Sequence, residues 1–222
     1  MKHYINAGLT LVLLSASVGV QAQTAGTMMV KVGYSYFDPQ VSSGTMSAPS
    51  LPQTKVDVGG AGTLLLSGTY MYTDHISAEF YAGLPLKHNM FAAGSIQGAG
   101  VIGTVQQLPP TLFGQYRFRD ASAVFRPYVG LGLTYVRFQE ETGDGLLTAL
   151  TNPGGPPTTF VVDNAWGLTP QLGVSYWINS KWYLDASINK SYLKTTTHLS
   201  TGQSIDTTLN PLVGQISLGY RF

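Results

Sequence analysis

The chain contains no cysteine and little charge. Of its 222 residues, only 10% are Asp, Glu, Lys or Arg, whereas an average soluble domain carries about 25%. The lack of cysteine excludes disulfides, thiolate metal sites and a lipidated N-terminal cysteine, and it fits an oxidising compartment. The scarcity of charge indicates that most of the surface is not built to face water.

The sequence also lacks an excess of basic residues and lacks histidines at metal-binding spacings. A net charge of +1 provides no basic stripe, so we expect no nucleic acid as a partner. The histidines His75, His88 and His198 form no His-x-x-His or His-Glu-x-x-His spacing, so we expect no metal and no cofactor. Catalysis would need a nucleophile and a base within hydrogen-bond reach. No motif fixes such a pair, and we expect no enzyme.

One apolar run stands at the N-terminus, over residues 7–20. It follows the positively charged Lys2 and precedes small residues around Ala22, which is typical of a secretory signal peptide over residues 1–22. A transmembrane anchor is the alternative, but a membrane span needs roughly twenty apolar residues. We therefore expect cleavage after Ala22, a mature chain of residues 23–222, and no transmembrane helix.

Along the mature chain, apolar and polar residues alternate. The final segment puts a set of apolar side chains on one face of an extended strand: Leu212, Ile216, Leu218, Tyr220 and Phe222. We expect no further segment to cover this face in water, whereas lipid covers it in a bilayer. The mean hydropathy of +0.09 is too polar for membrane helices, and alternation reconciles this value with the scarcity of charge.

The alternation predicts seven further strands, over residues 28–38, 62–72, 76–84, 111–118, 127–139, 166–178 and 182–195. Three short connections alternate with four long ones, which we expect to be large outer loops: residues 40–55, 87–103, 140–163 and 196–206. This pattern predicts an all-β fold, an eight-stranded antiparallel up-and-down transmembrane β-barrel with tight periplasmic turns. The alternative is a secreted lipocalin-like barrel, which would carry its charges outside.

Several stretches, in order, resemble the outer-membrane protein W family of small barrels (OmpW/AlkL-like). They are Y-A-G-L-P-L-K-H at 81–88, L-P-P-T-L-F-G-Q-Y at 108–116, F-R-P-Y-V-G-L-G-L-T-Y at 125–135, G-V-S-Y at 173–176 and G-Y-R-F at 219–222. The resemblance spans essentially the whole mature chain. It implies a barrel in the outer membrane of a Gram-negative bacterium, whose narrow lumen passes small hydrophobic molecules that leave sideways into the bilayer.

On this basis we expect passive uptake of small hydrophobic solutes, with outer-membrane lipids and lipopolysaccharide as surroundings. The terminal Phe222 resembles the signal by which the barrel assembly machinery recognises such proteins. The alternative is a structural or surface-binding barrel with a closed bore, whose long loops bind phage, colicins or host molecules.

Five charged residues are expected on the inward faces near the periplasmic end: Lys31, Glu79, Arg117, Asp185 and Arg221. An eight-stranded bore is only wide enough for side chains, and unpaired buried charge is costly, so these groups should pair. Our hypothesis is that this cluster closes the bottom of the barrel. The alternative is that it only satisfies the inner wall and has no bearing on transport.

Prolines mark a candidate exit. Pro85, Pro109 and Pro110 stand at the upper ends of two strands that should be neighbours. Proline donates no ladder hydrogen bond and is poorly tolerated inside a sheet. A lateral opening is one interpretation, and simple strand ends are the other. The family resemblance favours the opening.

The upper bore should be apolar, with lining candidates Phe37, Phe113, Val136 and Phe138. Members of the family can constrict the lumen with an apolar residue on the third strand and a tryptophan on the seventh. The matching positions here hold Tyr81 and Asn189. The lumen constriction candidates are therefore Tyr81, Asn189 and Phe113. The two polar groups predict either a wetter constriction than in the family or a constriction at another level.

Overall fold

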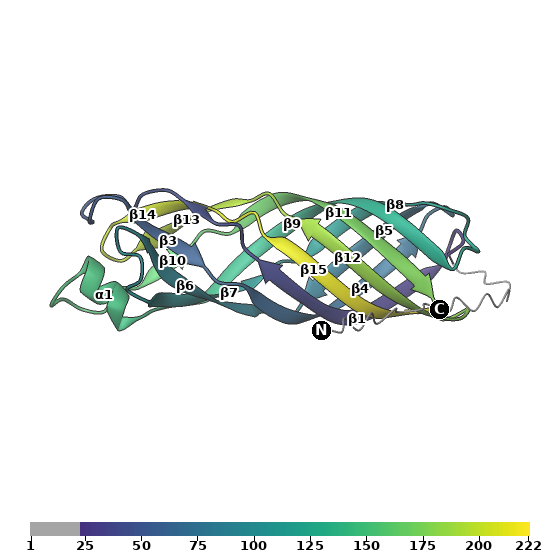
Figure 1. Ribbon diagram of the computed structural model, residues 1–222, viewed down its shortest axis with the longest axis horizontal. Helices are drawn as coiled ribbons and strands as arrows, with labels where there is room; N and C mark the ends of the chain where they lie inside the picture. Colours follow the sequence, from purple (N-terminus) through teal and green to yellow (C-terminus); the bar gives the residue numbers. More distant parts are fainter. Residues whose placement is uncertain (1–22) are drawn as a thin grey trace, which may run out of the picture.

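The computed structural model describes residues 23–222, so the expected signal peptide lies outside the described residues. The described chain forms a long closed cylinder of antiparallel strands (Figure 1). Eight strands make the ring, in the order β1 (Met28–Asp38), β4 (Ala61–Met71), β5 (Ile76–Gly83), β8 (Thr111–Arg117), β9 (Phe125–Gly143), β11 (Ala165–Trp177), β12 (Trp182–Lys190) and β15 (Leu212–Arg221). Because β15 pairs back onto β1, the ring closes. The predicted eight-stranded antiparallel barrel is confirmed.

The outside of the ring is apolar. Val32, Leu66 and Ile216, from three ring strands, expose 56%, 62% and 62% of their surface. On the same strands the intervening side chains point inward, and Lys31 is only 2% exposed. An apolar outer face over a polar interior is the pattern of a barrel whose solvent is lipid.

The cylinder continues beyond the apolar band. β6 (Leu86–Gly94) and β7 (Val101–Leu108) prolong β5 and β8, and β3 (Thr54–Val58) pairs with β6. A second sheet has the order β10 (Phe160–Val162), β13 (Lys194–Leu199), β14 (Ser204–Thr208) and β2 (Ser42–Ser43). These elements and the helix α1 (Gly145–Thr151) gather at the end opposite the C-terminus (Figure 1). We call this end the outer end. The opposite end carries the short turns, and we call it the turn end.

The outer end has an apolar core of its own. Met46, Val56, Met90, Phe138 and Leu199 are among the buried residues of this cluster, and the side chains of α1 pack against it through Leu147. Within residues 23–222, no helix is long and apolar enough to cross a membrane.

Two expectations from the sequence are wrong at the outer end. The four long connections are not simply loops, since they contain β2, β3, β6, β7, β10, β14 and α1. The strand expected over residues 182–195 ends at Lys190, and β13 begins at Lys194 in a different sheet. His88 and His198 consequently lie in β6 and β13 rather than in loops. The outward residues here face water, so the apolar stripe that identified the ring strands is absent from these segments.

Candidate functional site

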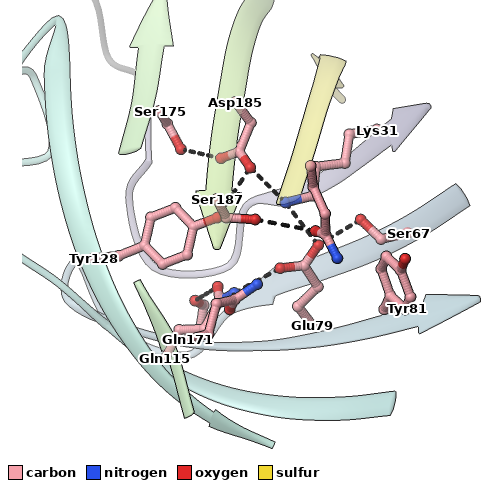
Figure 2. A network of polar contacts seen from close by, with 12 residues as sticks. Lys31, Ser67, Glu79, Tyr81, Gln115, Tyr128, Gln171, Ser175, Asp185 and Ser187 are labelled. Atoms are coloured by element: carbon pink, nitrogen blue, oxygen red, sulfur yellow. Dashed lines mark hydrogen bonds and ion pairs between the residues drawn. The ribbon is translucent and has the colours of Figure 1, made fainter. Parts of the chain in front are cut away.

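Near the turn end, three charged side chains meet inside the barrel. The Lys31 ammonium lies 2.9 Å from Glu79 and 2.8 Å from Asp185, and all three side chains are at least 97% buried. They project from β1, β5 and β12, so one lysine bridges opposite parts of the wall (Figure 2). Unpaired buried charge is very costly, and the two carboxylates are satisfied here by a shared cation.

Neutral side chains donate further hydrogen bonds to the oxygens of these two carboxylates. Ser67 Oγ donates to Glu79 at 2.5 Å and Gln115 Nε2 donates to it at 2.6 Å. Tyr128 Oη and Ser175 Oγ donate to Asp185 at 2.9 and 2.8 Å. Figure 2 shows these donors converging from several strands on the bore. A fully satisfied buried network of this kind is rigid.

Arg117 joins the same network through neutral partners rather than through an ion pair within the described chain. Its guanidinium donates to Ser77, Ser175 and Gln115 at 3.2, 3.0 and 2.8 Å. It also lies over the Tyr128 ring, 4.6 Å from the centroid. The structure thus brings four of the five expected charges together.

Arg221 does not join them. It faces inward at the end of β15, level with Met29, but makes no salt bridge among the described residues, and its Nη1 is buried without a partner there. We define the network of Lys31, Glu79, Asp185 and Arg117, with the neutral donors named above, as the ionic floor.

The turn end below the ionic floor is filled as well. Met29, Met71, Trp177 and Tyr183 form a buried apolar layer. Arg126 donates from Nη1 to the Gln23 side chain at 2.7 Å and from Nη2 to the Asp74 carbonyl at 2.6 Å. Sequence reasoning missed Arg126 and Gln23, because the strand expected there began at residue 127, whereas β9 begins at Phe125 and includes Arg126.

On the outer side of the ionic floor lies a cavity. Its empty space is about 840 Å³, including the part that opens to solvent. Apolar side chains make much of its wall, among them Phe37, Val56, Met90, Val105, Val136 and Phe138. No Asp, Glu, Lys or Arg is found among the described residues that line it. The cavity therefore suits neutral, largely apolar molecules.

The three constriction candidates all line this cavity. Tyr81 and Phe113 pack together with Leu65 as a buried cluster between the cavity and the ionic floor, and the Tyr81 hydroxyl is held by Ser35 at 2.8 Å. Asn189 is 6% exposed and lies farther along the wall, opposite Val213 on the neighbouring strand.

One backbone ladder of the barrel wall is interrupted beside the cavity. Pairing between β5 and β8 ends at Tyr81–Thr111, and pairing between β6 and β7 resumes at Leu86–Gln107. The first chain advances five residues between these pairs and the second only four, so the register slips. Pro85, Pro109 and Pro110 lie in this interval, which we call the side gap, and Pro109 also lines the cavity. Proline has no N–H with which to close it.

His88 is a further inward-facing residue that sequence reasoning had assigned to a loop. Its ring is 2% exposed and lines the cavity, with Nδ1 2.6 Å from the Gly59 carbonyl. The outward neighbours Lys87 and Asn89 are polar and exposed, so this part of β6 lies beyond the apolar band. Burial lowers the pKa of His88, and its bond to the Gly59 carbonyl opposes this only in part.

An apolar outer band, a satisfied ionic floor and an uncharged cavity beyond it define a β-barrel of the outer-membrane type. Residues 24–222 match the model of the OmpW family. Outer membrane protein W of Vibrio cholerae is 34% identical over 226 residues, with 100% of both chains covered. The chain belongs to the OmpW family and is a protein of the Gram-negative outer membrane.

The chain is also similar to two other proteins. The crystal structure of the outer membrane protein OprG from Pseudomonas aeruginosa superposes with a TM-score of 0.82 at 27% identity, covering 91% of this chain and 99% of that one. The dibenzothiophene metabolism operon protein PahQ of Pseudomonas aeruginosa is 24% identical over 180 residues, or 80% of this chain and 79% of that protein.

Proposed function

We propose that the protein is a channel for the passive uptake of small hydrophobic molecules, which enter from the outer end and leave through the side gap into the bilayer. The observation that carries this proposal is the uncharged cavity that ends on Tyr81 and Phe113, with the ionic floor beyond them, and borders the side gap. The chain needs no cofactor and no energy source for such a role, and no enzymatic step is part of it.

The cavity suits apolar solutes on energetic grounds. Moving apolar surface out of water is favourable by about 25 cal/mol per Å². A solute that enters the cavity gains this free energy before it reaches the lipid. A charged solute would lose its hydration and find no ion of opposite sign in the described wall, which is very costly. The printed name of PahQ links that relative to dibenzothiophene, an apolar aromatic compound, and this supports the same class of solute.

The exit route depends on which protein interactions a solute would have to break on its way out. Passage through the turn end would separate Lys31 from Glu79 and Asp185, and breaking a buried pair costs about 3–5 kcal/mol. The two chains of the side gap make no ladder pairs with each other between Tyr81–Thr111 and Leu86–Gln107, which supports an exit there into the lipid, where an apolar solute is soluble. We infer that the ionic floor directs the solute sideways and does not open during transport.

Whole cells test this function. Cells that contain the barrel should take up ethylbenzene faster than cells without it, while uptake of a charged aromatic such as benzoate should be equal in both. Equal ethylbenzene uptake would remove the channel. If such cells nevertheless gained a phage or colicin receptor, the surface-binding alternative would take its place.

Partners follow from the location. We propose that lipopolysaccharide surrounds the outer end and that the barrel assembly machinery recognises the C-terminal residue, since Phe222 is 75% exposed. A Phe222→Ala variant should accumulate unassembled protein in the periplasm.

A further inference from the structure

Four hydroxyl groups form a chain across the cavity wall. Thr111 lies 2.8 Å from Thr134, Thr134 lies 2.6 Å from Thr169, and Thr169 donates to Ser191 at 2.9 Å, all measured between side-chain oxygens. The residues come from β8, β9, β11 and the segment after β12, so this series of hydrogen bonds crosses neighbouring strands of the wall. Its first member stands beside the side gap.

The direction of the chain is fixed by counting protons. Each hydroxyl has one proton to donate. Because Thr169 gives its proton to Ser191, Thr134 must supply the bond to Thr169. Thr111 has two acceptors for its proton, and the Thr134 oxygen at 2.8 Å is nearer than the Pro109 carbonyl at 3.3 Å, so Thr111 supplies the bond to Thr134. The proton of Ser191 is left over, and the Ser191 hydroxyl donates no hydrogen bond to another of residues 23–222. Hydrogen bonds in such a chain strengthen one another, so the Ser191 hydroxyl is a strengthened donor.

Asn189 lies two residues from Ser191 on the same inward face and lines the same cavity. Its amide makes no hydrogen bond to another described residue, although it is 94% buried. A buried amide has two donors and a carbonyl acceptor to satisfy, and leaving them unpaired costs free energy. This pair of unpartnered groups faces a cavity that otherwise suits apolar matter.

We propose that the polar collar, formed by Thr111, Thr134, Thr169, Ser191 and Asn189, binds one neutral hydrogen-bonding head group. The favoured solutes are therefore small amphiphiles with a single hydroxyl or carbonyl group, such as an aromatic alcohol or a ketone, rather than hydrocarbons of the same size. This inference rests on the proposed uptake function and names the solute class within it.

The chemistry of the wall sets the limits of this class. Ser191 offers a donor and Asn189 offers both a donor and an acceptor, so an alcohol can bond to both while its apolar part contacts side chains such as Phe37 and Val136. A hydrocarbon of equal size would bury the same apolar surface but leave these groups unpaired. A carboxylate or ammonium head would lack an ion of opposite charge.

Ethylbenzene and benzyl alcohol provide a matched pair, since they have the same number of non-hydrogen atoms. We expect the barrel to raise uptake of benzyl alcohol about five-fold more than uptake of ethylbenzene, which corresponds to about 1 kcal/mol for one hydrogen bond. Asn189→Leu and Ser191→Ala should each reduce this preference. Thr196→Val removes a hydroxyl that bonds to Asp206 on the outer face, and it should leave the preference unchanged.

A second readout does not depend on transport. In ¹⁵N-labelled protein in lipid nanodiscs, benzyl alcohol should shift the side-chain amide resonance that Asn189→Leu removes, and ethylbenzene should not. If the barrel speeds both solutes equally and this resonance stays fixed, the polar collar is not a recognition site although the channel function stands. If neither solute enters faster than in cells without the barrel, the uptake function itself fails.

Discussion

At the scale of single residues, Lys31 is the side chain on which the closed interior depends. It is the shared cation for Glu79 and Asp185, and both carboxylates lie deep in the barrel. The inward position of all three was predictable, since alternation along β1, β5 and β12 leaves them on the face opposite the apolar stripe. The partners could not be read from the sequence, because Lys31 and Asp185 are 154 residues apart and only ring closure brings them together.

Removing the Lys31 charge should therefore destabilise the barrel. Lys31→Met leaves two buried carboxylates without a cation, and loss of one partner of a buried pair costs about 3–5 kcal/mol. The free energy of unfolding in urea, followed in lipid vesicles, measures the effect. Lys55→Met is the matched control, because Lys55 is exposed on β3. Equal stability of the two variants would show that the carboxylates do not need this lysine.

His88 should make the outer end sensitive to acid. Burial lowers its pKa in the folded protein, so the unfolded chain binds more protons, and stability falls as the pH drops through the ordinary value near 6.5 toward the lowered folded value. Lowering the pH from about 7.5 to about 5.5 should therefore destabilise the wild type more than His88→Phe. Thermal unfolding at the two values measures this. His198→Gln, at an exposed histidine, should behave like the wild type, and an equal response of His88→Phe would contradict the account.

At the scale of elements, the ring strands and the outer strands differ in how visible they are in the sequence. Ring strands separate lipid from an inner wall, so a continuous apolar stripe marks them. β13 and β14 separate water from a small core, and their outward residues are Lys194, Thr196, His198 and Asp206. Their pairing is set by contacts such as that of Thr196 with Asp206 and by the apolar core of the outer end. No local sequence pattern predicts these contacts.

The side gap provides an element-scale prediction. The double variant Pro85→Val and Pro110→Val restores two N–H groups where the ladder is interrupted. Ethylbenzene uptake by cells should fall several-fold, while the shift in electrophoretic mobility on heating should show an intact barrel. The double variant Pro153→Val and Pro156→Val, in the exposed turn after α1, is the control and should not change uptake. Unaltered uptake in the first variant would assign these prolines to strand ends alone.

At the scale of the whole molecule, the protein divides into an apolar band and an outer end that faces water. This division predicts how a surface charge is tolerated. Leu66→Arg places a cation in the middle of the band and should cost about 2–4 kcal/mol. Val161→Arg changes an equally exposed residue on β10, and it should cost little. The free energy of unfolding in lipid vesicles compares them, and similar values would place the membrane elsewhere.

The central claim is that apolar solutes occupy the cavity between the ionic floor and the outer end. Crystals of the protein soaked with bromobenzene test it most directly, because the anomalous signal of bromine locates the solute. The account predicts a bromine peak inside the barrel, between Phe113 and Val136 near the side gap. Bromine found only along the outer apolar band, with none in the cavity, would contradict it.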